Sequence, residues 1–249
     1  MPSYSELALI AAVFLLAGWV KGVVGMGLPT VAMGALGLAM APVQAAALLV
    51  VPSLVTNVWQ FVAGPSKVVV LRRFASMMLL VCVGTAIGIQ FLTSGSSRWP
   101  SLALGSILAL YAAIALFLPK FSVSKEAEHR LSPIVGGVTG VLAGATGVFV
   151  MPAVPYLSAL GLSKDELIQA LGLSFTVSTV ALAVALGASG SFSPTVLAAS
   201  SGAVVPALAG MFVGQYTRDR IEPVAFRKWF LVSMFLVGGY MAVRSLVAQ

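Results

Sequence analysis

A lysine lies inside a glycine-rich break between two apolar stretches that are long enough to enter a membrane. Lys21 is followed by Gly22, Gly25 and Gly27, and then by Pro29, which suits the first turn of a helix because its missing N–H is not needed there. A lysine at the centre of a membrane helix costs roughly 2.5–3.5 kcal/mol on insertion scales, so its default interpretation is functional. We expect Lys21 to supply positive charge to a small anion. The alternative is that the first helix ends there and the ammonium group reaches the membrane surface.

A second break of the same kind occurs in the other half of the chain. Thr146 and Gly147 precede Pro152, which could again start a half-helix. In carriers built from inverted repeats, half-helix N-termini near the middle of the membrane point N–H groups at anionic substrates. We therefore expect Gly25, Gly27 and Gly147 to line a binding site. The alternative is that these glycines only let helices pack closely, which is our interpretation of the glycines on regular spans. Those are Gly84, Gly88, Gly210 and Gly214.

Hydroxyl and amide side chains on the spans that follow the two breaks could complete such a site. They can hydrogen bond an oxyanion without adding charge, although each could instead bond a neighbouring helix, which is worth about 0.6 kcal/mol. The candidate substrate-binding residues are Lys21, Gly22, Gly25, Gly27, Thr30, Ser53, Asn57, Gln60, Thr146, Gly147, Gln169, Ser174 and Ser178.

The distribution of titratable residues argues against catalysis. All acidic residues fall at the N-terminus or in expected loops: Glu6, Glu126, Glu128, Asp165, Glu166, Asp219 and Glu222. The single histidine, His129, falls in the central loop, and the single cysteine is Cys82, so no metal motif and no serine–histidine pair at depth can be formed. We expect no enzymatic activity, no metal and no cofactor. We also expect no carboxylate that carries protons within the membrane.

Composition points to a polytopic membrane protein. Hydrophobic residues make up 59% of the chain and charged residues 8%, whereas soluble domains have about 25% charged residues. The formal net charge of +7 does not indicate a nucleic-acid partner, because membrane proteins gather basic residues in short cytoplasmic loops. Only Glu6 is charged before Lys21, so we expect no cleaved signal peptide.

Uncharged runs predict six ordinary spans and two broken ones, given that about 20 residues cross a bilayer. The ordinary spans are expected at 43–63, 74–93, 101–118, 167–187, 195–216 and 229–247. The broken segments, 7–40 and 133–160, contain glycine and proline near their centres. Irregular backbone at membrane depth is tolerated only where protein buries it or water reaches it.

The two halves of the chain match one another. Equivalent glycines recur at a nearly constant separation, which is 118 residues for Gly22 and Gly140 and 126 for Gly88 and Gly214. Equivalent loops have opposite basic character, which predicts an inverted-topology repeat in which each half is a broken helical hairpin plus three transmembrane helices. We expect a first membrane repeat over 1–118, a basic cytoplasmic linker over 119–132 and a second membrane repeat over 133–249.

Basic residues also predict the orientation. If each broken segment enters and leaves on one side, the basic loops 64–73, 119–132 and 217–228 are all cytoplasmic and both termini are outside. If each broken segment crossed once, 217–228 with its four basic residues would lie outside, against the positive-inside rule. We therefore prefer the hairpin arrangement.

The two breaks resemble the paired motifs of the sulfite exporter TauE/SafE family. The motifs are Lys21-Gly22-x-x-Gly25-x-Gly27-x-Pro29, followed by Pro42, and Gly140-x-x-x-Gly144-x-x-Gly147-x-x-x-x-Pro152. The second motif has Val148 and Phe149 where the family often continues with glycine. The resemblance covers nearly the whole chain. It implies an integral inner-membrane protein that moves small organosulfur compounds or sulfur oxyanions, such as sulfite, sulfoacetate or related sulfonates.

We therefore expect an all-α integral membrane protein that works as a secondary transporter by alternating access around a midplane anion site. Its partners would be a small anionic substrate and the lipid bilayer, with a homo-oligomer left open. A negative-inside potential drives a monoanion outward, which favours export. A passive anion channel, a carrier of small carboxylates and a non-transporting scaffold remain alternatives. Substrate, coupling ion and oligomeric state cannot be read from the chain.

Overall fold

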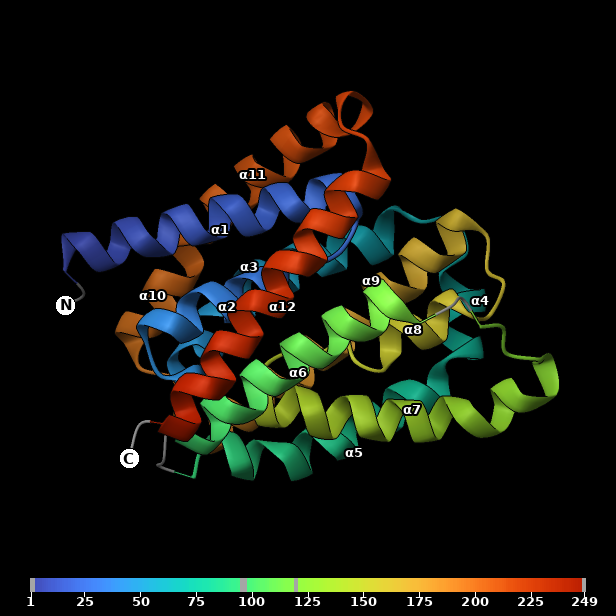
Figure 1. Ribbon diagram of the computed structural model, residues 1–249. Helices are drawn as coiled ribbons and strands as arrows, with labels where there is room; N and C mark the ends of the chain where they lie inside the picture. The colour runs from blue at the N-terminus through green and yellow to red at the C-terminus, as the bar shows by residue number, and fades with distance from the viewer. Residues whose placement is uncertain (1–2, 95–97, 119–120, 248–249) are drawn as a thin grey trace.

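The computed structural model describes residues 3–94, 98–118 and 121–247, and its secondary structure is helical throughout these ranges (Figure 1). In chain order the elements are α1 (Tyr4–Val24), α2 (Leu28–Ala39), α3 (Pro42–Ala63), α4 (Lys67–Arg73), α5 (Ala75–Leu92), α6 (Arg98–Phe117), α7 (Lys125–Thr146), α8 (Ala153–Ser158), α9 (Lys164–Ala188), α10 (Pro194–Gly202), α11 (Val204–Thr217), the 3-10 turn η1 (Arg218–Arg220) and α12 (Pro223–Val247).

Within the described residues, seven helical segments are long and apolar enough to cross a membrane. They are α1, α3, α5, α6, α9, the run α10–α11 and α12. Large apolar side chains such as Val184, Phe212 and Leu236 point outward from them, which is the arrangement expected of helices surrounded by lipid. The protein is therefore an all-α, multi-pass membrane protein, and the six ordinary spans predicted from the sequence are confirmed as helices.

The first broken segment turns back where its glycines predict it. Helix α1 ends with the Gly25 N–H donating to the Lys21 carbonyl at 2.7 Å, and Gly25 adopts a φ of 83°. Gly27 follows with a φ of 105°, and Pro29 lies in the first turn of α2. Positive φ at two positions reverses the chain, because only glycine adopts this conformation without strain. The short helix α2 then returns toward the end of the molecule where α1 began (Figure 1).

The second broken segment has a longer first arm than expected. Helix α7 ends at Gly147, whose φ is 71°, and the six-residue helix α8 follows a short irregular stretch. However, α7 begins at Lys125, inside the expected loop 119–132, whose first two residues lie outside the described residues. Ser124 explains the early start, because its hydroxyl accepts the Ala127 N–H at 3.3 Å and caps the helix. The loop prediction is therefore wrong from Lys125 onward.

Several acidic residues assigned to loops lie instead in the first turns of helices. Glu126 and Glu128 are in the first turn of α7, and Asp165 and Glu166 are in the first turn of α9. Negative charge is favoured there because the helix macrodipole is positive at the N-terminus. The sequence-based assignment used hydropathy, and these first turns are too polar to count as part of an apolar span. They were therefore assigned to loops.

Glycines set the closest helix contacts. Helix α1 packs most extensively on α11 and α5 on α7, while α6 packs on α12 and α3 on α9. A Cβ added to Gly84 would lie 2.3 Å from the Gly137 carbonyl oxygen, and one added to Gly210 would lie 2.0 Å from that of Leu15. Backbones at this distance leave no room for a side chain. The packing role predicted for these glycines on regular spans is confirmed.

Both termini lie at one end of the molecule, and α4, the start of α7 and η1 lie at the other (Figure 1). This is the arrangement that two hairpins returning to their own side require. The inverted repeat and the side of the membrane that each end faces stay predictions.

Candidate functional site

Lys21 is buried in the last turn of α1, with 4% of its surface exposed. Its Nζ donates to the Thr56 hydroxyl at 3.1 Å and to the Asn57 side-chain oxygen, both on α3. Thr56 accepts readily because its own hydroxyl proton is donated to the Pro52 carbonyl at 2.8 Å. A lysine ammonium has three N–H donors. Two of them are thus satisfied by neutral oxygens, and no carboxylate within the described residues forms an ion pair with Lys21.

A chain of polar side chains extends from Lys21 across the bundle. Asn57 donates its amide N–H to Ser53 Oγ at 2.9 Å, and Ser53 shares a hydrogen bond of 3.2 Å with Thr179 on α9. Because the Asn57 amide nitrogen is used by Ser53, its oxygen is turned toward Lys21. Ser53, Asn57 and Lys21 are all predicted site residues, and the structure brings them together. Thr179 was not predicted.

A cavity of about 430 Å³ lies beside Lys21, and Pro65 next to α4 and Arg218 of η1 also line it. Four predicted residues line it: Lys21, Gly22, Gly25 and Gln60. It is also lined by residues that the sequence did not single out, namely Trp59, Gln215, Arg218 and Asp165. These come from α3, α11, η1 and α9, so no local motif could have grouped them.

The charged groups of the cavity are two basic residues and one acidic residue. Lys21, Arg218 and Asp165 are the charged residues in its lining. The formal balance is positive, which favours an anion. The assignment of Asp165 to a loop was wrong, because α9 begins at Lys164 and its first turn borders the cavity.

Two glutamines fasten α3 to α9 beside the cavity. Gln60 donates to the Ile168 carbonyl at 2.9 Å, and Gln169 donates to the Phe61 carbonyl at 2.9 Å. Gln169 also accepts the Ser66 N–H at 2.9 Å. Backbone groups therefore use both the oxygen and the nitrogen of the Gln169 side-chain amide. Gln169 holds α3 and α9 together and is not one of the residues that line the cavity.

The remaining predicted residues are not part of the lining of the Lys21 cavity. Thr30, Ser174 and Ser178 are fully buried, with hydroxyls that have no partner within the described residues. Thr146 donates to the Leu142 carbonyl at 2.7 Å, inside α7. Gly147 packs against Met33, and a Cβ added to Gly147 would lie 3.0 Å from the Met33 side chain.

Gly27 also lies outside the cavity lining. A Cβ added there would meet Val20 and Phe230, at 3.3 and 3.4 Å. Gly22 has a second role beside lining the cavity, since an added Cβ would be 2.3 Å from the Met211 carbonyl oxygen on α11.

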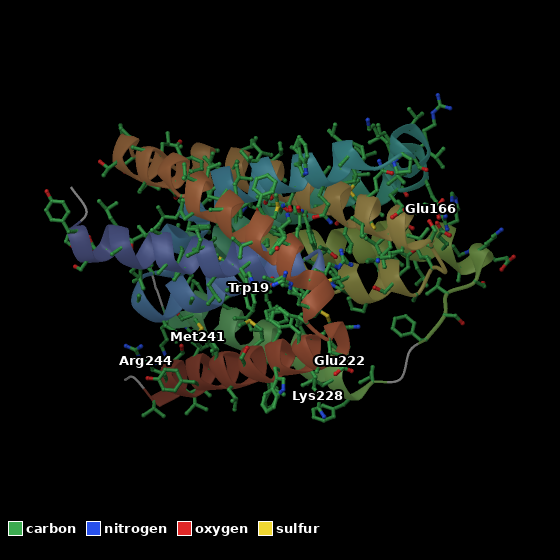
Figure 2. All side chains as sticks on the ribbon, turned by 90° about the horizontal axis from the view of Figure 1, so that it is seen from above. Trp19, Glu166, Glu222, Lys228, Met241 and Arg244 are labelled. Atoms are coloured by element: carbon green, nitrogen blue, oxygen red, sulfur yellow. The ribbon has the colours of Figure 1, made fainter. Side chains whose placement is uncertain are left out.

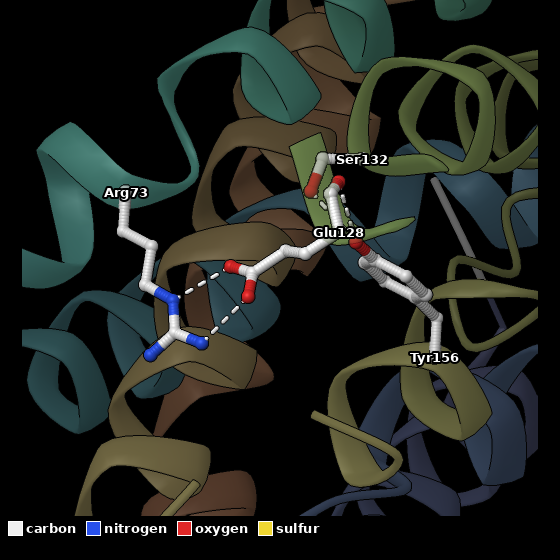
Figure 3. Close-up of polar contacts among 4 residues, drawn as sticks. All are labelled: Arg73, Glu128, Ser132 and Tyr156. Carbon is white, nitrogen blue, oxygen red and sulfur yellow. Dashed lines mark hydrogen bonds and ion pairs between the residues drawn. The ribbon is translucent and has the colours of Figure 1, made fainter. Parts of the chain in front are cut away.

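An ion pair fastens the second hairpin to α4 (Figure 3). Arg73 Nε and Nη2 donate to the two carboxylate oxygens of Glu128 at 2.6 and 2.8 Å, and this bond raises the pKa of the guanidinium above its usual value. The Tyr156 hydroxyl donates to the Glu128 carbonyl at 3.2 Å and shares a 2.7 Å hydrogen bond with Ser132. One end of the second hairpin is thus closed by polar contacts among α4, α7 and α8.

In the described part of the chain, no three or more histidine, cysteine or acidic residues lie together so that they could hold a metal ion. The protein family described as Sulfite exporter TauE/SafE matches residues 10–241. The match covers both breaks and all residues named above at the Lys21 cavity. No curated protein and no solved structure matches the chain.

Proposed function

This chain belongs to the sulfite exporter TauE/SafE family, and from that premise we propose that it is a secondary transporter of a small organosulfur compound or sulfur oxyanion. Sulfite, sulfoacetate and related sulfonates are the proposed substrates. Membership of this family, together with seven helical segments of the described residues that are long and apolar enough to cross a membrane, supports a multi-pass membrane protein with a role in transport.

The observation that carries the proposal is the environment of Lys21. Moving a charged ammonium out of water is costly unless a partner offsets the loss of hydration. Thr56 and Asn57 offer two neutral oxygens, and the third N–H has no protein partner within the described residues. A sulfonate or sulfite oxygen would accept that hydrogen bond and balance the charge. Charge-assisted bonds of this kind are about twice as strong as neutral ones.

We propose that transport proceeds by alternating access. The Lys21 cavity extends toward the end that carries α4 and η1, since Pro65 and Arg218 line it, and both of these elements carry basic residues. Under the positive-inside rule this end faces the cytoplasm, so both termini would lie outside the inner membrane. A substrate would load from the cytoplasm. The membrane potential then assists outward movement of a monoanion by about 2.3 kcal/mol per 100 mV.

The proposed function is tested by binding and flux with the purified protein. Thermal stability is measured with sulfite, sulfoacetate, thiosulfate and acetate, because a ligand that binds the folded state raises the unfolding temperature. We expect stabilisation by the sulfur anions and saturable uptake of the same compounds into proteoliposomes. Stabilisation by acetate alone would move the substrate class to carboxylates. An ohmic single-channel current without saturation would indicate a passive channel.

A further inference from the structure

A second cavity with basic side chains lies at the opposite end of the molecule from the mouth of the Lys21 cavity. It measures about 520 Å³ and lies where α6 begins and α12 ends, beside the α2–α3 turn. Its charged residues are Arg98 and Arg244, and Ser101 and Ser245 also line it. No lining residue is acidic. Figure 2 shows Arg244 and Met241 toward one end of the molecule, far from Glu166 at the other end.

The position of Arg98 is fixed by the end of α12. Its Nε donates to the Ser245 carbonyl at 3.0 Å, and its Nη2 lies 3.4 Å from the Leu246 carbonyl oxygen. The guanidinium also lies over the Trp99 ring, 5.7 Å from its centroid. These contacts hold a planar donor group in one place, so little side-chain freedom remains to be lost on binding. A guanidinium in a fixed orientation matches the oxygen pairs of sulfonate and phosphate groups.

A purely structural role, in which a basic side chain only stabilises the end of α12, would explain Arg98 but not the presence of Arg244 beside it. Basic side chains in the last turn of a helix interact favourably with its macrodipole, and Arg98 already occupies the carbonyls at the end of α12. Arg244 comes from the last turn of α12 itself, and it lines the cavity together with Arg98. Two positive side chains bordering one cavity repel each other unless an anion lies between them.

From this placement we propose that the Arg98–Arg244 cavity is a second oxyanion site, which takes a sulfonate, sulfite or phosphate group. Helix α2 connects the two cavities: the break before it contributes Gly25 to the first, and its last turn contributes Gly37 and Leu38 to the second. Its twelve residues span about 18 Å. The oxyanion is either the free substrate anion, docked on the side opposite the Lys21 cavity, or the phosphate of an anionic lipid. The evidence for this binding site is the cavity and its two arginines, so the site does not depend on the transport proposal.

The first arm of the test measures free anions. Binding of sulfite and of inorganic phosphate to the full-length, delipidated protein is measured by calorimetry in a Lys21→Ala background, which removes the first site. Arg244→Gln and the Arg98→Gln/Arg244→Gln double variant are compared with Lys67→Gln/Lys228→Gln, which removes the same charge from exposed residues at the other end. If the site takes free anions, the double arginine variant weakens binding at least tenfold and the lysine control leaves it unchanged.

The second arm measures lipid. The same variants are reconstituted in bilayers with and without phosphatidylglycerol, and the lipids that remain bound are counted by native mass spectrometry. If the ligand is a lipid phosphate, the wild-type protein and the lysine control retain phosphatidylglycerol that the arginine variants lose. Arg244→Gln keeps the Arg98 hydrogen bonds to α12, so it reports on the site even if the double variant does not fold. The proposal is overturned if neither free-anion affinity nor retained phosphatidylglycerol differs between the arginine variants and the lysine control.

Failure of this site is distinguishable from failure of the proposed function. The arginine variants in the wild-type background keep Lys21, so stabilisation by sulfite through the first cavity should persist in them. Suppose that Lys21→Ala abolishes all anion binding while the arginine variants change neither anion binding nor lipid retention. The Lys21 site is then supported and the Arg98–Arg244 site is refuted.

Discussion

The two broken hairpins occupy matching places in the chain, but the described residues at the two breaks have different surroundings. The break between α1 and α2 presents Lys21 and Gly25 to a space of about 430 Å³. The break between α7 and α8 is filled by Val148, Phe149 and Val150, none of which is more than 1% exposed. Positions that match in the predicted repeat therefore need not supply equal halves of a binding site.

The difference follows from what each break has to stabilise. In the second hairpin, Phe149 packs against Phe175 of α9 with ring centroids 5.9 Å apart, and burial of apolar surface holds the irregular backbone in place. In the first, a buried ammonium is held by Thr56 and Asn57. The second half contributes to the polar region through α9, by way of Thr179, rather than through its own break. The asymmetry also accounts for Val148 and Phe149 in place of further glycines.

The strongest test of this comparison changes one polar residue at each break. Lys21→Ala should weaken sulfite or sulfonate binding by about 1.5–3 kcal/mol, the range for hydrogen bonds to charged groups, and Lys21→Arg should keep part of the affinity. Thr146→Ala should leave affinity unchanged, because its hydroxyl is bonded within α7. Calorimetry on the three variants gives the answer. Equal affinity of wild type and Lys21→Ala would show that Lys21 does not contact the substrate and only holds α1 against α3.

Packing, unlike chemistry, should be equivalent in the two hairpins. An added Cβ at Gly22 would lie 2.3 Å from a carbonyl oxygen of α11, and one at Gly140 would lie 2.2 Å from a carbonyl oxygen of α5. Gly22→Ala and Gly140→Ala should therefore both lower the free energy of unfolding, by about 1–3 kcal/mol each. Gly202→Ala is the control, because nothing lies within 4 Å of its added Cβ. A large loss at one hairpin and none at the other, in thermal denaturation, would contradict equivalent packing.

The fold was more predictable from the sequence than the site. Charge-free runs and the glycine and proline positions predicted every long helix and the break after Lys21, because backbone hydrogen bonding in lipid leaves few alternatives. The polar first turns of α7 and α9 were missed because hydropathy does not detect a capped helix outside the apolar span. Ser124 and Ser163 are the local signals that could have found them, since each caps a helix.

The cavity could be predicted only in part. Lys21 and Gln60 could be predicted from the sequence, because a charge or an amide is conspicuous within an apolar segment. The sequence could not predict Trp59, Gln215 and Arg218, because these residues meet only when α3, α11 and η1 pack together. Thr30, Ser174 and Ser178 are polar and buried, yet burial alone does not say which cavity a hydroxyl faces.

A smaller effect is expected at the acidic residue of the first cavity. Asp165 lies in its lining with Lys21 and Arg218, so its charge opposes an incoming anion. Asp165→Asn should strengthen anion binding by up to about 1 kcal/mol, as expected for a partly solvated charge at an effective dielectric between protein and water. Glu126→Gln, an exposed acidic residue at the start of α7, should have no effect. Flux that disappears in Asp165→Asn and follows the pH gradient in wild type would instead make Asp165 a coupling residue.

The smallest expected effect concerns the ion pair that fastens the second hairpin. Arg73 is 34% exposed and Glu128 is 13% exposed, so water and salt screen part of their attraction, and such pairs contribute about 0.2–1 kcal/mol. Glu128→Gln should therefore lower the unfolding temperature only slightly, and added salt should shrink the difference from wild type. Glu128→Gln should also leave sulfite affinity unchanged, because the pair lies on α4 and α7 rather than at the Lys21 cavity. Loss of sulfite binding in Glu128→Gln with an unchanged unfolding temperature would show that the second hairpin acts on the site and that the two breaks are coupled.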